Sequence, residues 1–229
     1  MTLVVIAVVS GALVVGALWG VLGRLPPRVE GFVVALAGGA LIVSATLELV
    51  DPATATSPLW GVAVATLGGA VTFVALDSTL SRGVGAASGI GLLLAIVLDG
   101  IPENLAMGVA LIDSTPTQVA ALSGSILLSN LPEAAGGARA MVQDRSPRSV
   151  LLLWTVTAVV LALAAVAGNL LLADVPAAGL GLVKCFAAGA VVASLATEVF
   201  PTAFREDSYA AGIATALGFT LAIVLDQLG

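Results

Sequence analysis

The hydrophobic positions of this chain fall into eight long apolar runs separated by short polar breaks. A helix needs about 20 apolar residues to cross the hydrocarbon core of a bilayer, and the runs are close to that length. The breaks are rich in proline, glycine, serine and charged residues, which are typical of loops. We therefore expect eight transmembrane helices, at Leu3–Leu22, Phe32–Val50, Leu59–Leu76, Ala87–Leu111, Val119–Met141, Val150–Leu172, Gly179–Phe200 and Ala210–Leu228.

Positive charges indicate which side of this arrangement is cytoplasmic. The breaks after the odd-numbered runs, with the end of the fifth run, hold Arg24, Arg28, Arg82, Arg139, Arg145, Arg148 and Arg205. The opposite side holds only Lys184. Because lysine and arginine concentrate in cytoplasmic loops, we expect both termini outside.

Two internal similarities organise the eight runs. The second and seventh run share a pattern at an offset of 150 residues, in which Gly39, Ala40, Ser44 and Glu48 match Gly189, Ala190, Ser194 and Glu198. The fourth and fifth run share a Pro-Glu pair at an offset of 30. Chance similarity between helices rich in alanine and glycine is the alternative explanation.

Both similarities relate helices that are an odd number of crossings apart, so the matched helices run in opposite directions. Inverted repeats of this kind are typical of secondary transporters with a site near the midplane. We expect a single all-α transmembrane domain over residues 1–229, with helices grouped as three, two and three over 3–79, 87–142 and 150–228.

The composition agrees with this class and excludes several functions. Of the 229 residues, 59% are hydrophobic and 10% are charged, whereas a soluble domain carries about a quarter charged residues. The chain has no histidine and one cysteine, which excludes imidazole chemistry, an internal disulfide and a cysteine metal cage. No basic patch indicates nucleic-acid binding.

Carboxylates inside the fourth and fifth runs are the candidate chemistry. Asp99 and Glu103 lie four residues apart and share one face of a helix, as do Ser129 and Glu133, and Asn130 follows Ser129. An ionised carboxylate at the centre of a bilayer costs at least about 2.5 kcal/mol, so it must face a cavity or a partner. A packing seam of protonated acids is the alternative.

A proline precedes each of the two glutamates. Pro102 and Pro132 have no backbone N–H, so the carbonyls of Leu98 and Leu128 lose their helical partners, and we expect both helices to bend. Freed carbonyl oxygens beside carboxylates form an oxygen-rich environment that suits a cation.

Four further acids are less directly interpreted. Glu48 and Glu198 lie late in the second and seventh run, and are either gate or pathway residues or acids at the membrane interface. Asp77 and Asp226 are expected to be solvated helix ends.

At the fourth and fifth runs the sequence resembles the ZIP (Zrt/Irt-like) family of divalent metal transporters. That family carries a pattern like H-N-x-P-E-G in its fourth helix and x-x-x-P-E-G in its fifth. Here the segments read D-G-I-P-E-N at 99–104 and S-N-L-P-E-A at 129–134, and E-V-F-P-T at 198–202 is similar to a family stretch E-x-x-P-E. The eight spans, outside termini and repeat also match the family.

The resemblance implies a secondary transporter of the cell membrane that carries a divalent cation (Zn²⁺, Mn²⁺, Cd²⁺ or Mg²⁺) toward the cytoplasm, as substrate and not as cofactor. It implies a metal site formed by Asp99, Glu103, Ser129, Asn130 and Glu133, and family members can be homodimers. Asp99 replaces the family histidine, so the ligands are all oxygen, which favours harder cations such as Mn²⁺ or Mg²⁺.

Three alternatives stay open. The same acids would also serve a carrier for protons, sodium ions or a small organic cation. An intramembrane hydrolase needs a water-activating arrangement, and no enzyme motif is present beyond these glutamates. A membrane component that no longer transports is the third alternative.

Overall fold

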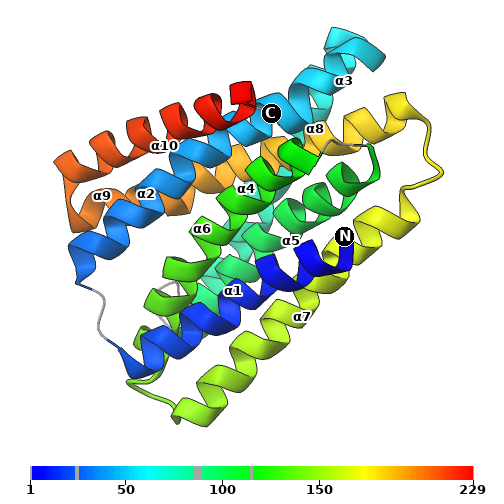
Figure 1. The fold of residues 1–229 in the computed structure, drawn as a ribbon. Coiled ribbons are helices and arrows are strands. Elements are labelled where there is room, and N and C mark those ends of the chain that lie inside the picture. The colour runs from blue at the N-terminus through cyan, green and yellow to red at the C-terminus, as the bar shows by residue number, and fades with distance from the viewer. Residues whose placement is uncertain (1, 24–25, 85–88, 114–115, 229) are drawn as a thin grey trace.

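A computed structural model describes residues 2–23, 26–84, 89–113 and 116–228 (Figure 1). Within these ranges the chain is helical apart from short turns. Its elements are α1 (Thr2–Leu22), α2 (Pro27–Ser44), the π-helix η1 (Ala45–Val50), α3 (Asp51–Thr56), α4 (Leu59–Val84), α5 (Gly89–Asp113), α6 (Pro116–Met141), α7 (Pro147–Leu171), α8 (Ala177–Ser194), the π-helix η2 (Leu195–Val199), α9 (Phe200–Glu206) and α10 (Ser208–Leu228).

Every predicted apolar run overlaps a long helix of the described chain. Among the described residues, five stretches are long and apolar enough to cross a membrane, namely Thr2–Leu22, Pro27–Thr56, Leu59–Thr79, Pro147–Leu171 and Ala177–Glu206. Two shorter apolar stretches, Glu103–Ile112 and Ser208–Val224, lie in α5 and α10. The chain is thus an all-helical protein with several helices suited to a membrane, as predicted.

Large apolar side chains cover the outside of the bundle. Leu3, Trp60, Leu67, Leu152 and Phe204 are between 62% and 73% exposed. A water-soluble protein rarely exposes contiguous apolar surface on this scale, whereas a bilayer solvates it. The surface therefore supports a membrane-embedded protein.

The long helices pack as two groups of four. In the α1 group (α1, α5, α6 and α7), the most extensive contacts join α1 to α6 and α5 to α7. In the α2 group (α2, α4, α8 and α10), they join α2 to α10 and α4 to α8. The groups meet mainly where α2 packs on α6 and α5 packs on α8.

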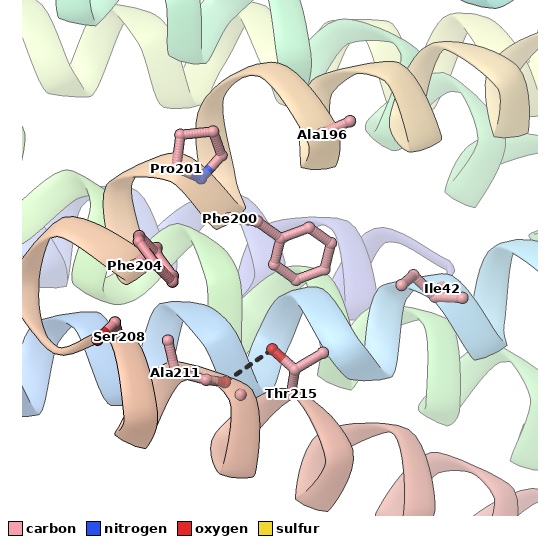
Figure 2. Close-up of a pocket in the computed structure, with 9 residues that line it drawn as sticks. Ile42, Ala196, Phe200, Pro201, Phe204, Ser208, Ala211 and Thr215 are labelled. Carbon is pink, nitrogen blue, oxygen red and sulfur yellow. Dashed lines mark hydrogen bonds between the residues drawn. The ribbon is translucent and has the colours of Figure 1, made fainter.

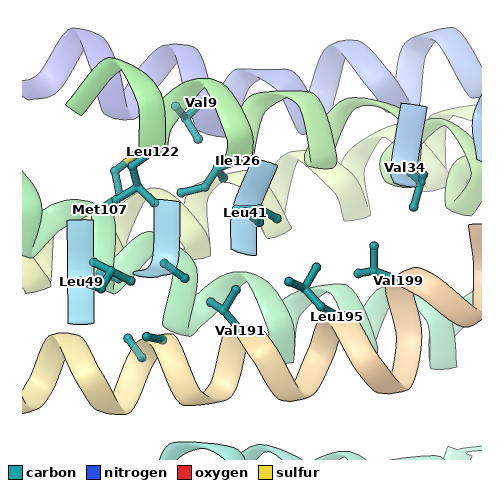
Figure 3. Packing of buried hydrophobic residues seen from close by; sticks show 14 of the residues in the cluster. Val9, Val34, Leu41, Leu49, Met107, Leu122, Ile126, Val191, Leu195 and Val199 are labelled. Atoms are coloured by element: carbon teal, nitrogen blue, oxygen red, sulfur yellow. The ribbon is translucent and has the colours of Figure 1, made fainter. Parts of the chain in front are cut away.

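The apolar core lies where these central helices meet (Figure 3). It includes Leu41 of α2, Leu49 of η1, Met107 of α5, Ile126 of α6 and Val191 of α8. None of the five is more than 3% exposed. Because lipid is as apolar as these side chains, close packing and not transfer from water holds such a core together.

Glycines allow the closest helix contacts, and in the α2–α10 pair they do so reciprocally. A Cβ added to Gly39 of α2 would overlap the carbonyl oxygen of Thr215 on α10. A Cβ added to Gly218 of α10 would overlap the carbonyl oxygen of Leu36 on α2. The two backbones therefore touch at this crossing, as small residues permit in membrane helices.

The α4–α8 pair makes the same contact at equivalent positions. Gly69 of α4 lies against the carbonyl of Phe186, and Gly189 of α8 lies against the carbonyl of Thr66. The α8 residues stand 150 positions after their α2 counterparts, and the α10 residues stand 149 positions after their α4 counterparts. The offset of 150 read from the sequence therefore also relates contacts in space.

Two π-helical segments were not predicted. In η1 the N–H of Asp51 reaches back five residues to the carbonyl of Thr46, and in η2 the N–H of Phe200 reaches back to Leu195. A proline follows each donor residue. Its ring would collide with the carbonyl four residues earlier in an α-helix, and the wider π turn accommodates that clash.

Both ends of the bundle are defined by what they contain. The start of α1, the end of α10 and α3 lie at one end, called here the terminus end (Figure 1). The end of α1, the start of α2 and α9 lie at the opposite end.

One expectation is corrected: α4 continues to Val84, so Asp77 lies inside the helix, half-buried, and not at a solvated helix end.

Candidate functional site

The two central acidic helices are antiparallel neighbours. Only two residues separate the end of α5 at Asp113 from the start of α6 at Pro116. Positions 99 and 130 each stand 14 residues from these ends, so they lie at about the same height in the bundle. A bend was expected at Pro132, and α6 continues as a helix through this residue.

Glu103 and Glu133 lie about one helical turn to either side of that height. In an α-helix every Cα–Cβ bond tilts toward the N-terminus. The N-terminal direction points away from the connection in α5 and toward it in α6. The Cα–Cβ bonds of Glu103 and Glu133 therefore both tilt toward the height of positions 99 and 130.

Burial places these residues inside the protein. Glu103 is 4% exposed and Asn130 is 2% exposed, while Glu133 is half-buried. Glu103 stands four residues before Met107, and Asn130 stands four residues after Ile126. Both therefore extend the apolar faces of α5 and α6 that meet in the core.

The amide of Asn130 is not fully used by the protein. Its Nδ2 atom is buried and has no hydrogen-bond partner among the described residues. Because the oxygen and nitrogen of an amide can exchange places by rotation, this side chain can present its carbonyl oxygen to a ligand. Asn130 is therefore suited to complete a set of oxygen ligands.

Two of the five predicted site residues have side chains outside the described part of the structure. These are Asp99 and Ser129, whose backbone lies on α5 and α6 at the height just defined. Among the described side chains, no group of three or more histidine, cysteine, aspartate or glutamate residues could hold a metal ion. A third acidic ligand beside Glu103 and Glu133 would have to be Asp99.

Asn104 is a buried polar residue that was not predicted as a site residue. It is 0% exposed, and its Nδ2 atom donates to the carbonyl of Gly100 over 2.8 Å. Its Oδ1 atom has no donor in the described part of the chain. Gly100, on the same face, packs against Leu161 of α7, so Asn104 adjoins Glu103 on the α7 side of α5. Its sequence signal is an amide directly after Pro-Glu.

Glu30 brings a further carboxylate to α6. Its Oε1 atom occupies the space that a Cβ on Gly136 would fill. Gly136 lies one turn beyond Glu133, toward the opposite end of the bundle. Arg139 and Glu206 are close enough for their charges to act on Glu30. The sequence did not reveal this contact because Glu30 lies at a helix start.

The two predicted pathway residues both lie in π-helices. Glu48 lies in η1 and is 3% exposed, and Glu198 lies in η2 and is half-buried. Glu48 is thus enclosed by the protein and is not an exposed interfacial acid. π-helical turns occur frequently at functional sites.

An apolar groove on α2, η2, α9 and α10 is a separate feature (Figure 2). Its volume is about 710 Å³, and Phe200, Pro201 and Phe204 contribute to its lining. The hydroxyl of Thr215 in its wall donates to the carbonyl of Ala211 over 2.9 Å. The groove contains no acidic side chain among its lining residues, so it is not a cation site.

Comparison with known proteins assigns no family to this arrangement. No family model matches the chain, and no curated protein matches it significantly.

Proposed function

We propose that this protein is a secondary transporter that carries a divalent metal cation across the cell membrane toward the cytoplasm, in the manner of the ZIP family. The observation that carries the proposal is the placement of Glu103 and Glu133 within about one turn of the same height on the neighbouring helices α5 and α6, with Glu103 and Asn130 buried. Carboxylates enclosed in a membrane protein need a cation, a proton or another partner, so their placement favours cation binding.

The packing of the helices supports a 3+2+3 inverted repeat of eight transmembrane helices. Exchanging α1 with α7, α2 with α8, α4 with α10 and α5 with α6 converts each principal helix pair into another observed pair. The reciprocal glycine contacts obey the same exchange. Inverted repeats place a substrate site at their interface, where α5 and α6 lie.

The positions of the ends support the proposed orientation. The start of α1 and the end of α10 share the terminus end (Figure 1). Arg28, Arg139, Arg148 and Arg205 lie near helix ends at the opposite end. In our proposal the terminus end faces outward, because arginine concentrates on the cytoplasmic side.

The proposed site combines Glu103 and Glu133 as central ligands with Asp99, Ser129 and Asn130. All of these residues offer oxygen, so we propose Mn²⁺ or Mg²⁺ as better substrates than Zn²⁺. The proposed site belongs to the α1 group, whereas Glu48 and Glu198 lie in η1 and η2, which continue α2 and α8 of the α2 group. Alternating access would arise from movement of one group against the other at the α2–α6 and α5–α8 contacts.

Uptake into proteoliposomes tests this function. Wild-type protein should accumulate Mn²⁺ inside liposomes, whereas Glu103→Gln should reduce uptake to the level of empty liposomes because the charge that holds the cation is lost. Asp174→Asn, which changes an exposed acid between α7 and α8, is the matched control and should keep wild-type uptake. Movement of protons or sodium ions without any metal uptake would contradict the proposal of a metal substrate. It would favour the alternative, a carrier for protons or sodium ions.

A further inference from the structure

Glu48 is a buried carboxylate outside the central site. It is 3% exposed, and its Oε2 atom has no hydrogen-bond partner in the described part of the chain. A buried carboxylate oxygen that lacks a donor is costly unless a positive charge or a bound cation compensates it. We therefore expect a positive charge or a cation near Glu48.

Asp226 on α10 lies at the same height as Glu48. α2 and α10 both run toward the terminus end (Figure 1) and touch at the crossing of Gly39 and Gly218. Glu48 is nine residues beyond Gly39, and Asp226 is eight residues beyond Gly218. At about 1.5 Å per residue, both acids stand roughly 12–14 Å from the crossing toward the terminus end.

Lys184 on α8 reaches the same region from the other side. A Cβ added to Gly181, one turn before it, would lie 3.0 Å from the Cβ of Ala53 on α3, and α8 contacts η1 directly. Because α8 runs away from the terminus end, the next turn of α8 lies beside η1. Lys184 is 7% exposed, so its ammonium is enclosed in the protein. The charges of Asp226 and Lys184 both act on Glu48.

We propose that Glu48 and Asp226 form a second subsite for a divalent cation, in which the Lys184 ammonium takes the place of the cation while none is bound. When both carboxylates are ionised, the two carboxylates and the ammonium together carry one negative charge, which attracts a cation into the subsite. Glu48 lies in η1, which continues α2, and Lys184 and Asp226 lie on α8 and α10, whereas Glu103 and Glu133 lie on α5 and α6. The proposal rests on the proposed function only for the class of ion.

The internal repeat distinguishes this subsite from the corresponding place at the opposite end. Glu198 and Asp77 are the repeat counterparts of Glu48 and Asp226, and they stand nine and eight residues beyond the Gly189–Gly69 crossing. The counterpart of Lys184 is Val34. A buried lysine is thus specific to the terminus end.

Thermal unfolding of the purified full chain with MnCl₂ tests the subsite. The starting protein carries Glu103→Gln and Glu133→Gln, which remove the central carboxylates. Mn²⁺ should raise its Tm, and adding Lys184→Met should enlarge that rise and lower the Mn²⁺ concentration at its midpoint about tenfold, because the competing ammonium is gone. Further addition of Glu48→Gln should abolish the rise, whereas Asp51→Asn, at an exposed acid three residues away, should keep it.

Two results would overturn the proposal: a Mn²⁺-dependent rise that survives Glu48→Gln, or no rise with Lys184→Met. If Lys184→Met does not fold, Asp226→Asn is the second variant, since Asp226 is half-buried near the end of α10. It should weaken the Mn²⁺ midpoint severalfold, and an unchanged midpoint would contradict the subsite. This experiment measures Mn²⁺ binding in a protein without the central carboxylates. A negative result would therefore contradict the subsite but not the proposed transport, and a failure to detect transport would not contradict the subsite.

Discussion

Gly39 on α2 and Gly218 on α10 mark the point where their helices cross, and each lies directly against the backbone of the other helix. The same relationship joins Gly69 on α4 to Gly189 on α8. Each of the two helix pairs of the α2 group is therefore joined by an equivalent backbone contact that leaves no room for a side chain.

Replacing Gly39 by valine should separate α2 from α10 and lower the free energy of unfolding by about 1–3 kcal/mol, because the added carbons overlap backbone that cannot move aside easily. Gly212→Ala on α10 is the control, because nothing lies within 4 Å of its Cβ position. Thermal unfolding in detergent would measure both variants. Equal Tm values for Gly39→Val and Gly212→Ala would contradict the close crossing.

The placement of Glu103 and Glu133 predicts that side-chain length matters as well as charge. Glu133→Asp keeps the charge but shortens the reach by one methylene, so it should raise the Mn²⁺ concentration needed for half-maximal uptake about tenfold. Glu206→Asp, at an exposed acid at the end of α9, should leave uptake unchanged. Wild-type concentration dependence in Glu133→Asp would show that this carboxylate does not touch the cation.

The contact between Glu30 and Gly136 predicts a coupled pair. Gly136→Ala places a methyl group where the Glu30 carboxylate lies, which should destabilise the protein by about 0.5–1 kcal/mol because only the end of a flexible side chain must move. Glu30→Ala removes that carboxylate, so the double variant should recover the loss. A double-mutant cycle from chemical unfolding would measure the coupling, and additive effects would contradict the contact.

Pro52, which follows Asp51, is expected to maintain the π-helical conformation of η1. Pro52→Ala restores a backbone N–H and removes the ring, so the π turn can convert to an α-helical turn. This conversion would change the direction of the Glu48 side chain. Uptake should fall severalfold while the Tm stays the same or rises. Pro58→Ala, at the turn before α4, is the control and should have neither effect. A lower Tm without any change in uptake would contradict a functional role for the π turn.

Local pattern was sufficient for much of the fold. The run Phe32–Val50 predicted a helix, and α2 with η1 covers it, because the length of an apolar run and backbone hydrogen bonding are local properties. The matched positions of Gly39 and Gly189 also predicted an equivalence that the glycine contacts display. The neighbourhood of α5 and α6 was readable for the same reason, since only two residues separate the two helices.

Other features depended on which helices become neighbours. The apolar run before Asp77 ends at Leu76, and nothing in that pattern indicated that α4 continues to Val84. In the sequence, Asn104 was only a departure from the glycine that follows Pro-Glu in the family pattern. Only the packing on the α7 side of α5 shows that Asn104 is fully buried. Pro52 was visible, but a proline can end, kink or widen a helix, and the surrounding contacts select among these outcomes.

By itself, the sequence determined the helices, and it indicated the offset that relates α2 to α8 and the carboxylates of the proposed central site, because hydrogen bonding within a helix and the length of an apolar run involve neighbouring residues. The tertiary structure decided that Glu48, Lys184 and Asp226 share one region and that Glu30 meets Gly136. These residues are far apart along the chain, and their meeting depends on the heights at which close-packed helices cross, which no local pattern encodes.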